Sequence, residues 1–522
     1  MSSDAEETPD PVVELRAKRD TIRRDMGGPQ RVAAMAARGE RTVREHIEGF
    51  VDPGSFTEVG TFSRSMNPLD RETTPGDGKI GGHATVGGRP VTVWGDDITV
   101  KRGSSAKVAS RKLERLVEAA YRAGNPLVHF GQTGGARIPD TLGTEGFCEV
   151  TPGGLLPVRQ RRVPLATAIV GPSFGGSSFY SAHSDFTVQV RGTSMAVTSP
   201  RVVEVATGER IGFEELGGVD VHARVTGQID QIAEDDDEAY QLIRQFLSFL
   251  PQNIHEPPPR RPFSGSAPPD PELYTMVPES RRRAYDMRKV LGRIVDDGEF
   301  LELRPLMGRS LICALGRIAG QPVGIAASNP MFQAGVLSPD AIEKFTRLIL
   351  LCDAYSLPII TLQDVPGFMV GAHVEHDRLL YKAITAQQCL RLAEVPKATI
   401  VLRKAYGLAF FSLGGPDQGF DEIMAWPGAQ LGFMDPDVGA NVLYGAELAE
   451  LPDDERTAEL ARRADALRDA TDPYDAAGTM RIDELIDPAD TRATLVRFVQ
   501  RHGERPFRSG AERPLASWPT CF

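Results

Sequence analysis

The stretch Val163–Phe179, VPLATAIVGPSFGGSSF, recurs 232 residues later as Val395–Phe411, VPKATIVLRKAYGLAFF. In both copies an apolar, β-branched run leads into a glycine turn, which is followed by small and aromatic residues. A strand, a glycine turn and a helix in this order are typical of a βαβ unit.

The same offset relates positions well outside these two stretches. GRPV at 88–91 matches GQPV at 320–323, and Pro126 and Gly135 match Pro358 and Gly367. One such pair would mean little in a chain with 39 Pro and 52 Gly, but a single register held over about 90 residues indicates duplication. We therefore expect two versions of one fold, with sites where the copies face each other.

Composition excludes several classes of protein. A net charge of −12 over 522 residues argues against a sequence-independent nucleic-acid binder. The five cysteines are odd in number, far apart and without a CxxC pair, so disulfide and zinc frameworks are not expected; they are Cys148, Cys313, Cys352, Cys389 and Cys521. The N-terminus lacks the apolar core of a signal peptide, and no run reaches the roughly 18 to 20 apolar residues of a membrane span, so we expect a cytoplasmic protein with no membrane partner.

The alternation of strand and helix patterns predicts an α/β organisation in four parts. These are an N-terminal helical arm (1–50), a first domain (51–255), a proline-rich linker (256–280) and a second domain (281–510). In the first domain the segment Tyr180–Val190 is expected to be helical.

Glycine clusters after the expected strands are the main candidates for chemistry. They are GQTGGAR (131–137), GPSFGG (171–176), VPGF (365–368) and AYGLA (405–409), and none is a Walker A loop or a dinucleotide-binding GxGxxG. Glycine leaves backbone N–H groups accessible, and two of them aimed at one point near a helix N-terminus stabilise an oxygen anion. An ordinary tight turn remains an alternative for any one cluster.

Side-chain candidates are weaker. There is no GxSxG elbow around Ser173, and His183 and Asp185 are two apart in the expected helix, so a catalytic triad is unsupported. HVEH at 373–376 has metal-ligating residue types, but a solvated loop accounts for it better. Basic groups at 101–111 and 159–162 would suit a phosphorylated ligand, with a solvated surface as the default reading.

Seven motifs in order make a family resemblance. They are GGARI (134–138), GPSFGGSSFYSAHSDFTVQV (171–190), SPRVVEVATGERIGFEELGG (199–218), NPMFQAG (329–335), DVPGFMVG (364–371), RKAYG (403–407) and AWPGAQLGFM (425–434). Over residues 41–501 the chain resembles the carboxyltransferase β subunit of the biotin-dependent acyl-CoA carboxylases, of the propionyl-CoA, acetyl-CoA and methylcrotonyl-CoA carboxylase type.

The resemblance implies two tandem crotonase-like (ClpP/crotonase) β-β-α superhelix domains in a subunit that forms a ring-like homo-hexamer. Acyl-CoA would lie mainly against the first domain of one chain and biotin against the second domain of a neighbour. The implied reaction transfers CO2 from N-carboxybiotin to the α-carbon, or the vinylogous γ-carbon, of an acyl-CoA, with no metal in this subunit. The chain has no biotinyl-lysine Met-Lys-Met triplet and no ATP-binding half, so a separate biotin carboxylase and biotin carrier (α) subunit is implied.

The family pattern also implies site residues. Two oxyanion holes would be formed by the backbone, the first at Gly175 and Gly176 with Gly135 and Ala136, the second at Leu408 and Ala409 with Gly367 and Phe368. Substrate contacts would come from Arg137, Phe179, Tyr406 and Phe411.

Three departures from the family bear on the second hole and the substrate. Leu408 replaces a glycine, where a positive φ would be strained, and DRLLYKAI at 377–384 replaces the usual stretch after the VPGF loop. Phe411 stands where propionyl-type enzymes often carry Asp, so its ring would reshape the acyl pocket. Two alternatives stay open: the decarboxylase subunit of a membrane-coupled sodium pump, and a non-catalytic scaffold paralogue.

Overall fold

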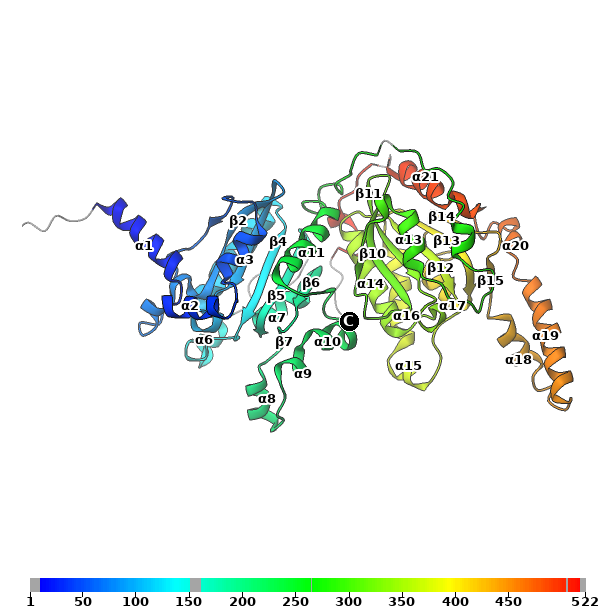
Figure 1. Cartoon of the computed structure of the whole chain (residues 1–522), viewed down its shortest axis with the longest axis horizontal. Helices are drawn as coiled ribbons and strands as arrows, with labels where there is room; N and C mark the ends of the chain where they lie inside the picture. The colour runs from blue at the N-terminus through cyan, green and yellow to red at the C-terminus, as the bar shows by residue number, and fades with distance from the viewer. Residues whose placement is uncertain (1–9, 151–160, 264, 504–505, 517–522) are drawn as a thin grey trace, which may run out of the picture. The chain divides into compact units, whose positions relative to one another are not determined.

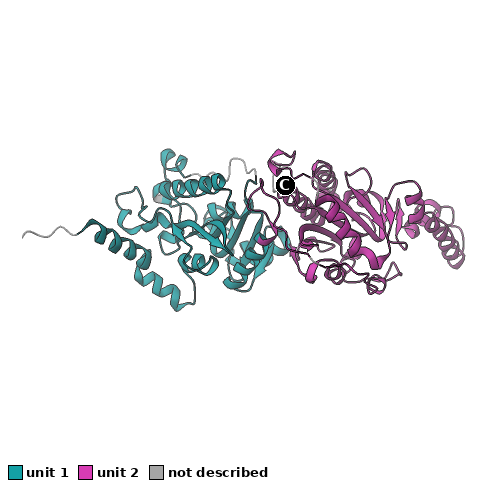
Figure 2. Ribbon diagram, turned by 90° about the horizontal axis from the view of Figure 1, so that it is seen from above, with its two compact units in different colours: residues 1–247 teal, residues 248–522 magenta. Residues whose placement is uncertain are grey.

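The computed structural model describes residues 10–150, 161–263, 265–503 and 506–516. Arg159 and Cys521, considered above, lie outside the described residues. The chain divides into two compact units, residues 1–247 and 248–522 (Figure 2), and the boundary falls in the last turn of α11 (Asp236–Phe249).

Unit 1 begins with three helices, α1 (Pro11–Asp25), α2 (Pro29–Ala37) and α3 (Val43–Phe50). A capping box starts α3, because Thr42 accepts from the Glu45 N–H and the Glu45 carboxylate accepts from the Thr42 N–H. The buried residues of α3 are spaced at one helical face, so this helix packs on the sheet while α1 has no buried residue.

The sheet of unit 1 has the order β1-β2-β3-β4-β5-β6-β8, with β7 paired to β5 (Figure 1). Its strands are β1 (Thr57–Glu58), β2 (Lys79–Val86), β3 (Arg89–Asp96), β4 (Leu127–Thr133), β5 (Leu165–Phe174), β6 (Phe186–Val190), β7 (Met195–Ala196) and β8 (Gln231–Ala233). The β2–β3 hairpin is antiparallel and the strands from β3 onward are parallel. The connecting helices are α4 (Lys107–Ala123), α5 (Ile138–Thr141), α6 (Thr144–Cys148), α7 (Gly176–His183), α8 (Pro200–Thr207), α9 (Phe213–Gly217) and α10 (Val219–Val221).

Unit 2 repeats this sheet in the order β16-β14-β13-β12-β11-β10-β9, with β15 paired to β13. Its strands are β9 (Phe300–Leu303), β10 (Leu311–Ile318), β11 (Gln321–Ser328), β12 (Ile359–Val365), β13 (Lys397–Tyr406), β14 (Glu422–Ala425), β15 (Gln430–Gly432) and β16 (Glu484–Leu485). Its helices are α12 (Leu273–Met276), α13 (Met287–Ile294), α14 (Pro339–Ala354), α15 (Ala372–His376), α16 (Leu379–Leu392), α17 (Gly407–Ser412), α18 (Pro436–Tyr444), α19 (Asp453–Asp469), α20 (Pro473–Gly478) and α21 (Thr491–Gly503).

The 232-residue offset holds in three dimensions. It carries β2, β3, β4 and β5 onto β10, β11, β12 and β13, and both hairpins keep the same register, Lys79 opposite Asp96 and Leu311 opposite Ser328. The offset no longer holds beyond the helices that follow β5 and β13. The next strands are β6 in unit 1 and β14 in unit 2, and β14 starts four residues later than an offset of 232 from the start of β6. The predicted tandem crotonase-like fold is confirmed.

One predicted element is wrong. The segment expected to be a helix over Tyr180–Val190 splits, because α7 ends at His183 and β6 runs from Phe186 to Val190. The sequence of β6, FTVQV, alternates apolar and polar residues as a strand does, but it has only five residues and begins three residues after α7 ends, so the helical pattern was extended through it. All five residues are buried, and the polar ones are hydrogen bonded inside the protein: the Thr187 N–H donates to Asp230 Oδ2 and the Gln189 amide to the Thr193 and Gly217 carbonyls.

Candidate active site: two pairs of backbone amides

The first glycine turn follows β4. The Ser105 N–H donates to the Gly135 carbonyl (2.9 Å), and the Arg137 N–H donates to the Ser105 carbonyl (2.8 Å). A residue that lies between two such ladder bonds directs its own N–H to the opposite side of the strand. The Ala136 N–H therefore faces away from Ser105.

The second turn of unit 1 follows β5 and starts α7. Gly175 has a φ of 66°, and a Cβ added to it would lie 3.4 Å from the Gly135 Cα, so the two turns are adjacent. The N–H of Gly176 is one of the first amides of α7, which have no partner within the helix, and a Cβ on Gly176 would meet nothing within 4 Å. Ala136 and Gly176 form what we call the first amide pair.

Unit 2 builds the same arrangement 232 residues on. The Leu337 N–H donates to the Gly367 carbonyl (3.0 Å) and the Met369 N–H to the Leu337 carbonyl (2.9 Å), which leaves the Phe368 N–H on the other side. Gly407 has a φ of 62° and begins α17, with Leu408 next. Phe368 and Leu408 form the second amide pair.

The expected strain at Leu408 is absent. The positive φ falls on Gly407, while Leu408 lies within α17 and is not among the residues with positive φ. Its side chain points outward and is 52% exposed, so the substitution keeps the backbone N–H and adds an apolar side chain at the mouth of the second pair.

The other glycines of the expected holes have conformational roles. The Gly175 N–H donates to the Val197 carbonyl (3.1 Å), and the Gly135 N–H donates to Thr133 Oγ1 (3.2 Å). Each amide pair thus combines one strand-end N–H with one helix N-terminus, an arrangement that favours a negatively charged oxygen.

Two expected substrate contacts face the protein interior. Arg137 is 4% exposed, and its guanidinium contacts Asp77 (2.7 Å) and Asp140 (3.2 Å). Tyr406 is fully buried, and its hydroxyl donates to Gln430 Oε1 (2.7 Å). Both side chains hold the turns in place.

The two expected aromatic contacts differ in exposure. Phe179 is 42% exposed on α7, whereas Phe411 is half-buried on α17 with its ring 5.3 Å from that of Phe410.

A buried charged cluster lies beneath the first amide pair and was not anticipated. Lys79 Nζ lies 2.5 Å from Asp96 Oδ1, and His129 Nε2 lies 3.6 Å from Asp96 Oδ2 and 3.4 Å from Ser177 Oγ, the second residue of α7. Burial opposes ionisation of Asp96, but the charge of Lys79 and the hydrogen bond with His129 outweigh it and hold the pKa well below its usual value. Because Asp96 and Ser177 approach the same nitrogen of His129, the group is no Ser-His-Asp relay.

Unit 2 supports its amide pair with different residues. Arg403 at the end of β13 binds Asp364 of β12 (2.8 Å), and it donates to the carbonyls of Pro278, Ser280 and Arg283. Charged residues at the ends of apolar strands were the available sequence signal for both clusters: Lys79 begins β2, and Arg403 stands beside Lys404 near the end of β13. Their partners come from neighbouring strands, which a linear reading does not join.

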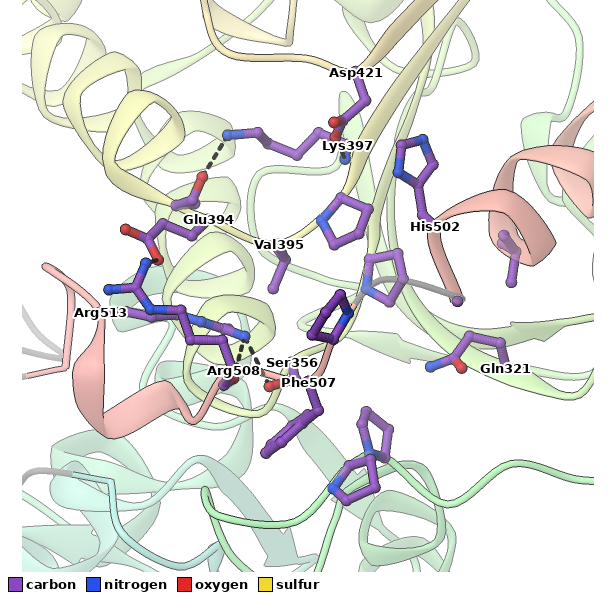
Figure 3. Close-up of a pocket in the computed structure, with 18 of the residues that line it drawn as sticks. Gln321, Ser356, Glu394, Val395, Lys397, Asp421, His502, Phe507, Arg508 and Arg513 are labelled. Carbon is purple, nitrogen blue, oxygen red and sulfur yellow. Dashed lines mark hydrogen bonds and ion pairs between the residues drawn. The ribbon is translucent and has the colours of Figure 1, made fainter.

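Figure 3 shows a cavity in unit 2. Its volume is about 900 Å³, and neither Phe368 nor Leu408 of the second amide pair lines it. It adjoins the amino ends of the parallel strands, at Pro358, Lys397 and Asp421, whereas the amide pair lies at their carboxyl ends, where open α/β sheets bind ligands. Arg508 in its wall is paired with Glu394, and Arg513 contacts Ser356 (3.0 Å). We therefore place the candidate site at the amide pairs.

Among the described residues, no group of three or more His, Cys, Asp or Glu side chains could hold a metal ion. No helix in the part of the chain that the structure describes is long and apolar enough to cross a membrane.

Two repeated crotonase-like units, each with an amide pair where a strand turns into a helix, suit an enzyme that stabilises oxygen anions. The carboxyl transferase domain matches residues 34–509, so the chain belongs to this family. The resemblance to the carboxyltransferase β subunits of biotin-dependent acyl-CoA carboxylases, and the enzyme class that it implies, are confirmed.

Relatives align over nearly their whole length. The chain is 36% identical to the propionyl-CoA carboxylase beta chain of Saccharopolyspora erythraea, covering 91% of this chain and 90% of the relative. It is 34% identical to the methylmalonyl-CoA carboxyltransferase 12S subunit of Propionibacterium freudenreichii subsp. shermanii, covering 94% of each. A crystal structure of transcarboxylase 12S, described as a hexamer assembly with methylmalonyl-coenzyme A and methylmalonic acid bound, superposes with a TM-score of 0.88 at 34% identity, covering 95% of this chain and 96% of that one.

Proposed function

We propose that this chain transfers CO2 from N-carboxybiotin, carried by a separate subunit, to the α-carbon of an acyl-CoA. The observation that carries the proposal is the repeated amide pair. Carboxyl transfer creates two oxygen anions, one on the acyl thioester and one on biotin, and the chain offers two backbone sites of the same design.

The first amide pair would hold the thioester oxygen while the α-carbon loses its proton. The N–H groups of Ala136 and Gly176 stabilise the negative charge that develops on that oxygen, and the new carbon–carbon bond then forms from the α-carbon to CO2. Carboxybiotin supplies the CO2, and its ring nitrogen takes the proton. Phe368 and Leu408 would donate to the biotin oxygen, so no side-chain nucleophile is required.

Exposed apolar side chains beside both pairs support a site that is completed by another copy of the chain. In unit 1 Ile138 and Leu142 are 63% and 72% exposed, and in unit 2 Val370 and Phe433 are 84% and 83% exposed. Surfaces of this kind mark protein contacts. We propose a ring-like homo-hexamer in which acyl-CoA binds the first amide pair of one chain and biotin the second pair of its neighbour.

Two alternatives are less well supported. The scaffold alternative was motivated by Leu408, but the second pair keeps its N–H and an unstrained backbone. A decarboxylase subunit of a sodium pump would use the same two pairs, and its partners would distinguish it.

The reverse reaction tests the proposal without the partner subunit. The purified chain is incubated with free biotin and a series of carboxylated acyl-CoA esters, from malonyl-CoA and methylmalonyl-CoA to long-chain and branched homologues, and CO2 release is measured. We expect release that requires biotin and needs no ATP. The scaffold alternative would be favoured if the chain released no CO2 from any ester in the presence of biotin and still assembled with an active carboxylase. Net acyl-CoA carboxylation with ATP after addition of the biotinylated subunit separates a carboxylase from a sodium-pump decarboxylase.

A further inference from the structure

A left-handed turn stands next to the first amide pair. Lys101, Arg102 and Gly103 have φ values of 48°, 59° and 63°. The equivalent residues of unit 2, Gln333–Gly335, have φ values of 48°, 53° and 80°. Non-glycine residues adopt this conformation at a cost of about 1 kcal/mol or more, so its presence in both copies shows that the fold requires the turn. The side chains on it are not required, because unit 2 builds the turn with Gln and Ala.

The stem of Arg102 packs on the turn that carries the first amide pair. The Gly134 N–H donates to the Arg102 carbonyl (2.8 Å). A Cβ added to Gly134 would lie 3.3 Å from Arg102 Cβ and 3.8 Å from Cδ, so the glycine leaves room for the arginine stem. In unit 2 Pro366 stands where unit 1 has Gly134, and Ala334 stands where it has Arg102. Unit 2 therefore has neither the space that a glycine leaves nor a long side chain to fill it.

Among the described residues, no ion pair compensates the charge of Arg102, unlike that of the basic side chains around it. Lys101 pairs with Asp70 (2.7 Å), and Lys107 (2.7 Å) and Arg111 (3.8 Å) pair with Glu149. Arg102 is exposed, and no ion pair joins it to another described residue.

We propose that Arg102 binds an anionic group of the acyl-CoA substrate held at the first amide pair. The proposal rests on the proposed function for the location of that substrate. A guanidinium offers two parallel N–H donors that match a phosphate or a carboxylate. An acyl-CoA offers both, since the coenzyme carries phosphates and some acyl chains end in a carboxylate.

Equilibrium binding tests the proposal without relying on turnover. The full chain and the variant Arg102→Ala are titrated with coenzyme A, with pantetheine, and with a pantetheine thioester whose acyl chain ends in a carboxylate. The alanine variant preserves the turn, because Ala334 adopts the same conformation in unit 2. Lys101→Ala is the matched control, since its side chain already pairs with Asp70.

The three probes separate the two sources of the anion. A loss of at least tenfold in affinity for coenzyme A, with pantetheine unchanged, assigns Arg102 to the phosphates. A similar loss confined to the thioester with the terminal carboxylate assigns it to the acyl chain. Affinities within twofold of the unaltered chain for all three probes, or equal losses in the Lys101→Ala control, would overturn the proposal. A chain that binds coenzyme A through Arg102 but releases no CO2 with biotin would instead refute the proposed function alone.

Discussion

Replacing Gly176 by proline removes one donor of the first amide pair without adding a side chain in a crowded place. Gly176 is the first residue of α7, a position where proline is favoured because its fixed φ suits the helix and its missing N–H breaks no helical hydrogen bond. Gly175 precedes it with φ 66° and ψ −126°, outside the α region that proline disfavours in its predecessor. A Cβ at 176 meets nothing within 4 Å, so the helix is expected to form normally.

The cost to catalysis follows from what remains. Loss of one oxyanion donor lowers kcat by about 10²- to 10³-fold, or about 2.7–4 kcal/mol of transition-state stabilisation. The Ala136 N–H is retained, so the variant keeps residual activity. Binding of the substrate in its ground state is expected to change less than kcat, because the oxygen becomes negative only as the proton leaves.

The assay is biotin-dependent CO2 release from the best carboxylated acyl-CoA, with Gly176→Ala as the matched control. Alanine retains the N–H and places its Cβ in the same open space, so its kcat is expected to remain near that of the unaltered chain. Circular dichroism and thermal unfolding check that both variants fold. If the folded proline variant turns over within threefold of the alanine variant, the Gly176 amide does not hold the reacting oxygen.

Three further changes test other parts of the chain. Phe411→Asp and Phe411→Ile are each expected to change relative kcat/KM across an acyl-CoA series by about tenfold or more, because the ring is half-buried on α17. An unchanged substrate preference in both variants would contradict a role of Phe411 in the acyl pocket. Lys79→Leu and Asp96→Ser each leave a buried charge unpaired, and each should lower the free energy of unfolding by about 3–5 kcal/mol. The double variant carries the residues found at the same positions in unit 2 and should lower it by less than either single change. Calorimetric unfolding of all three variants measures these differences. Burial and the nearby Arg41 lower the pKa of His46 to about 4 in the folded chain. As the pH falls from about 6.5 to 4, the imidazole is protonated in the unfolded chain before it is protonated in the folded one, so the free energy of unfolding declines by about 3 kcal/mol over that window. His46→Gln should lose this part of the pH dependence of unfolding, and an identical pH profile in the variant would show that His46 does not cause it.

The fold could be predicted from the sequence largely because the chain contains it twice. Glycine and proline positions kept their spacing, and the β-branched runs before them became β4, β5, β12 and β13. The strand Phe186–Val190 was missed although its sequence, FTVQV, alternates, because it is only five residues long and follows α7 so closely that both were assigned to one helix. A short alternating run beside a helix gives too few residues for its period to be separated from that of the helix.

The candidate site was predicted less completely. The glycine clusters were found, but the sequence did not reveal that the Gly175 and Gly135 amides are occupied and that their successors, Gly176 and Ala136, carry the exposed N–H groups. Which amide faces outward depends on a ladder bond to Ser105, more than 25 residues away along the chain.

Comparing the two units separates what the fold requires from what each site adds. The glycines before α7 and α17 agree in φ, 66° at Gly175 and 62° at Gly407, and Gly135 and Gly367 are both positive at 98° and 143°, so the backbone of the amide pairs is a property of the repeated fold. The side chains around those turns do not agree: Arg102 corresponds to Ala334, and Ser177, beside buried His129, corresponds to Ala409. Under the proposed function, one backbone design would stabilise two different oxygen anions, and the choice between an acyl thioester and a biotin ring would then come from the positions where the repeat is broken.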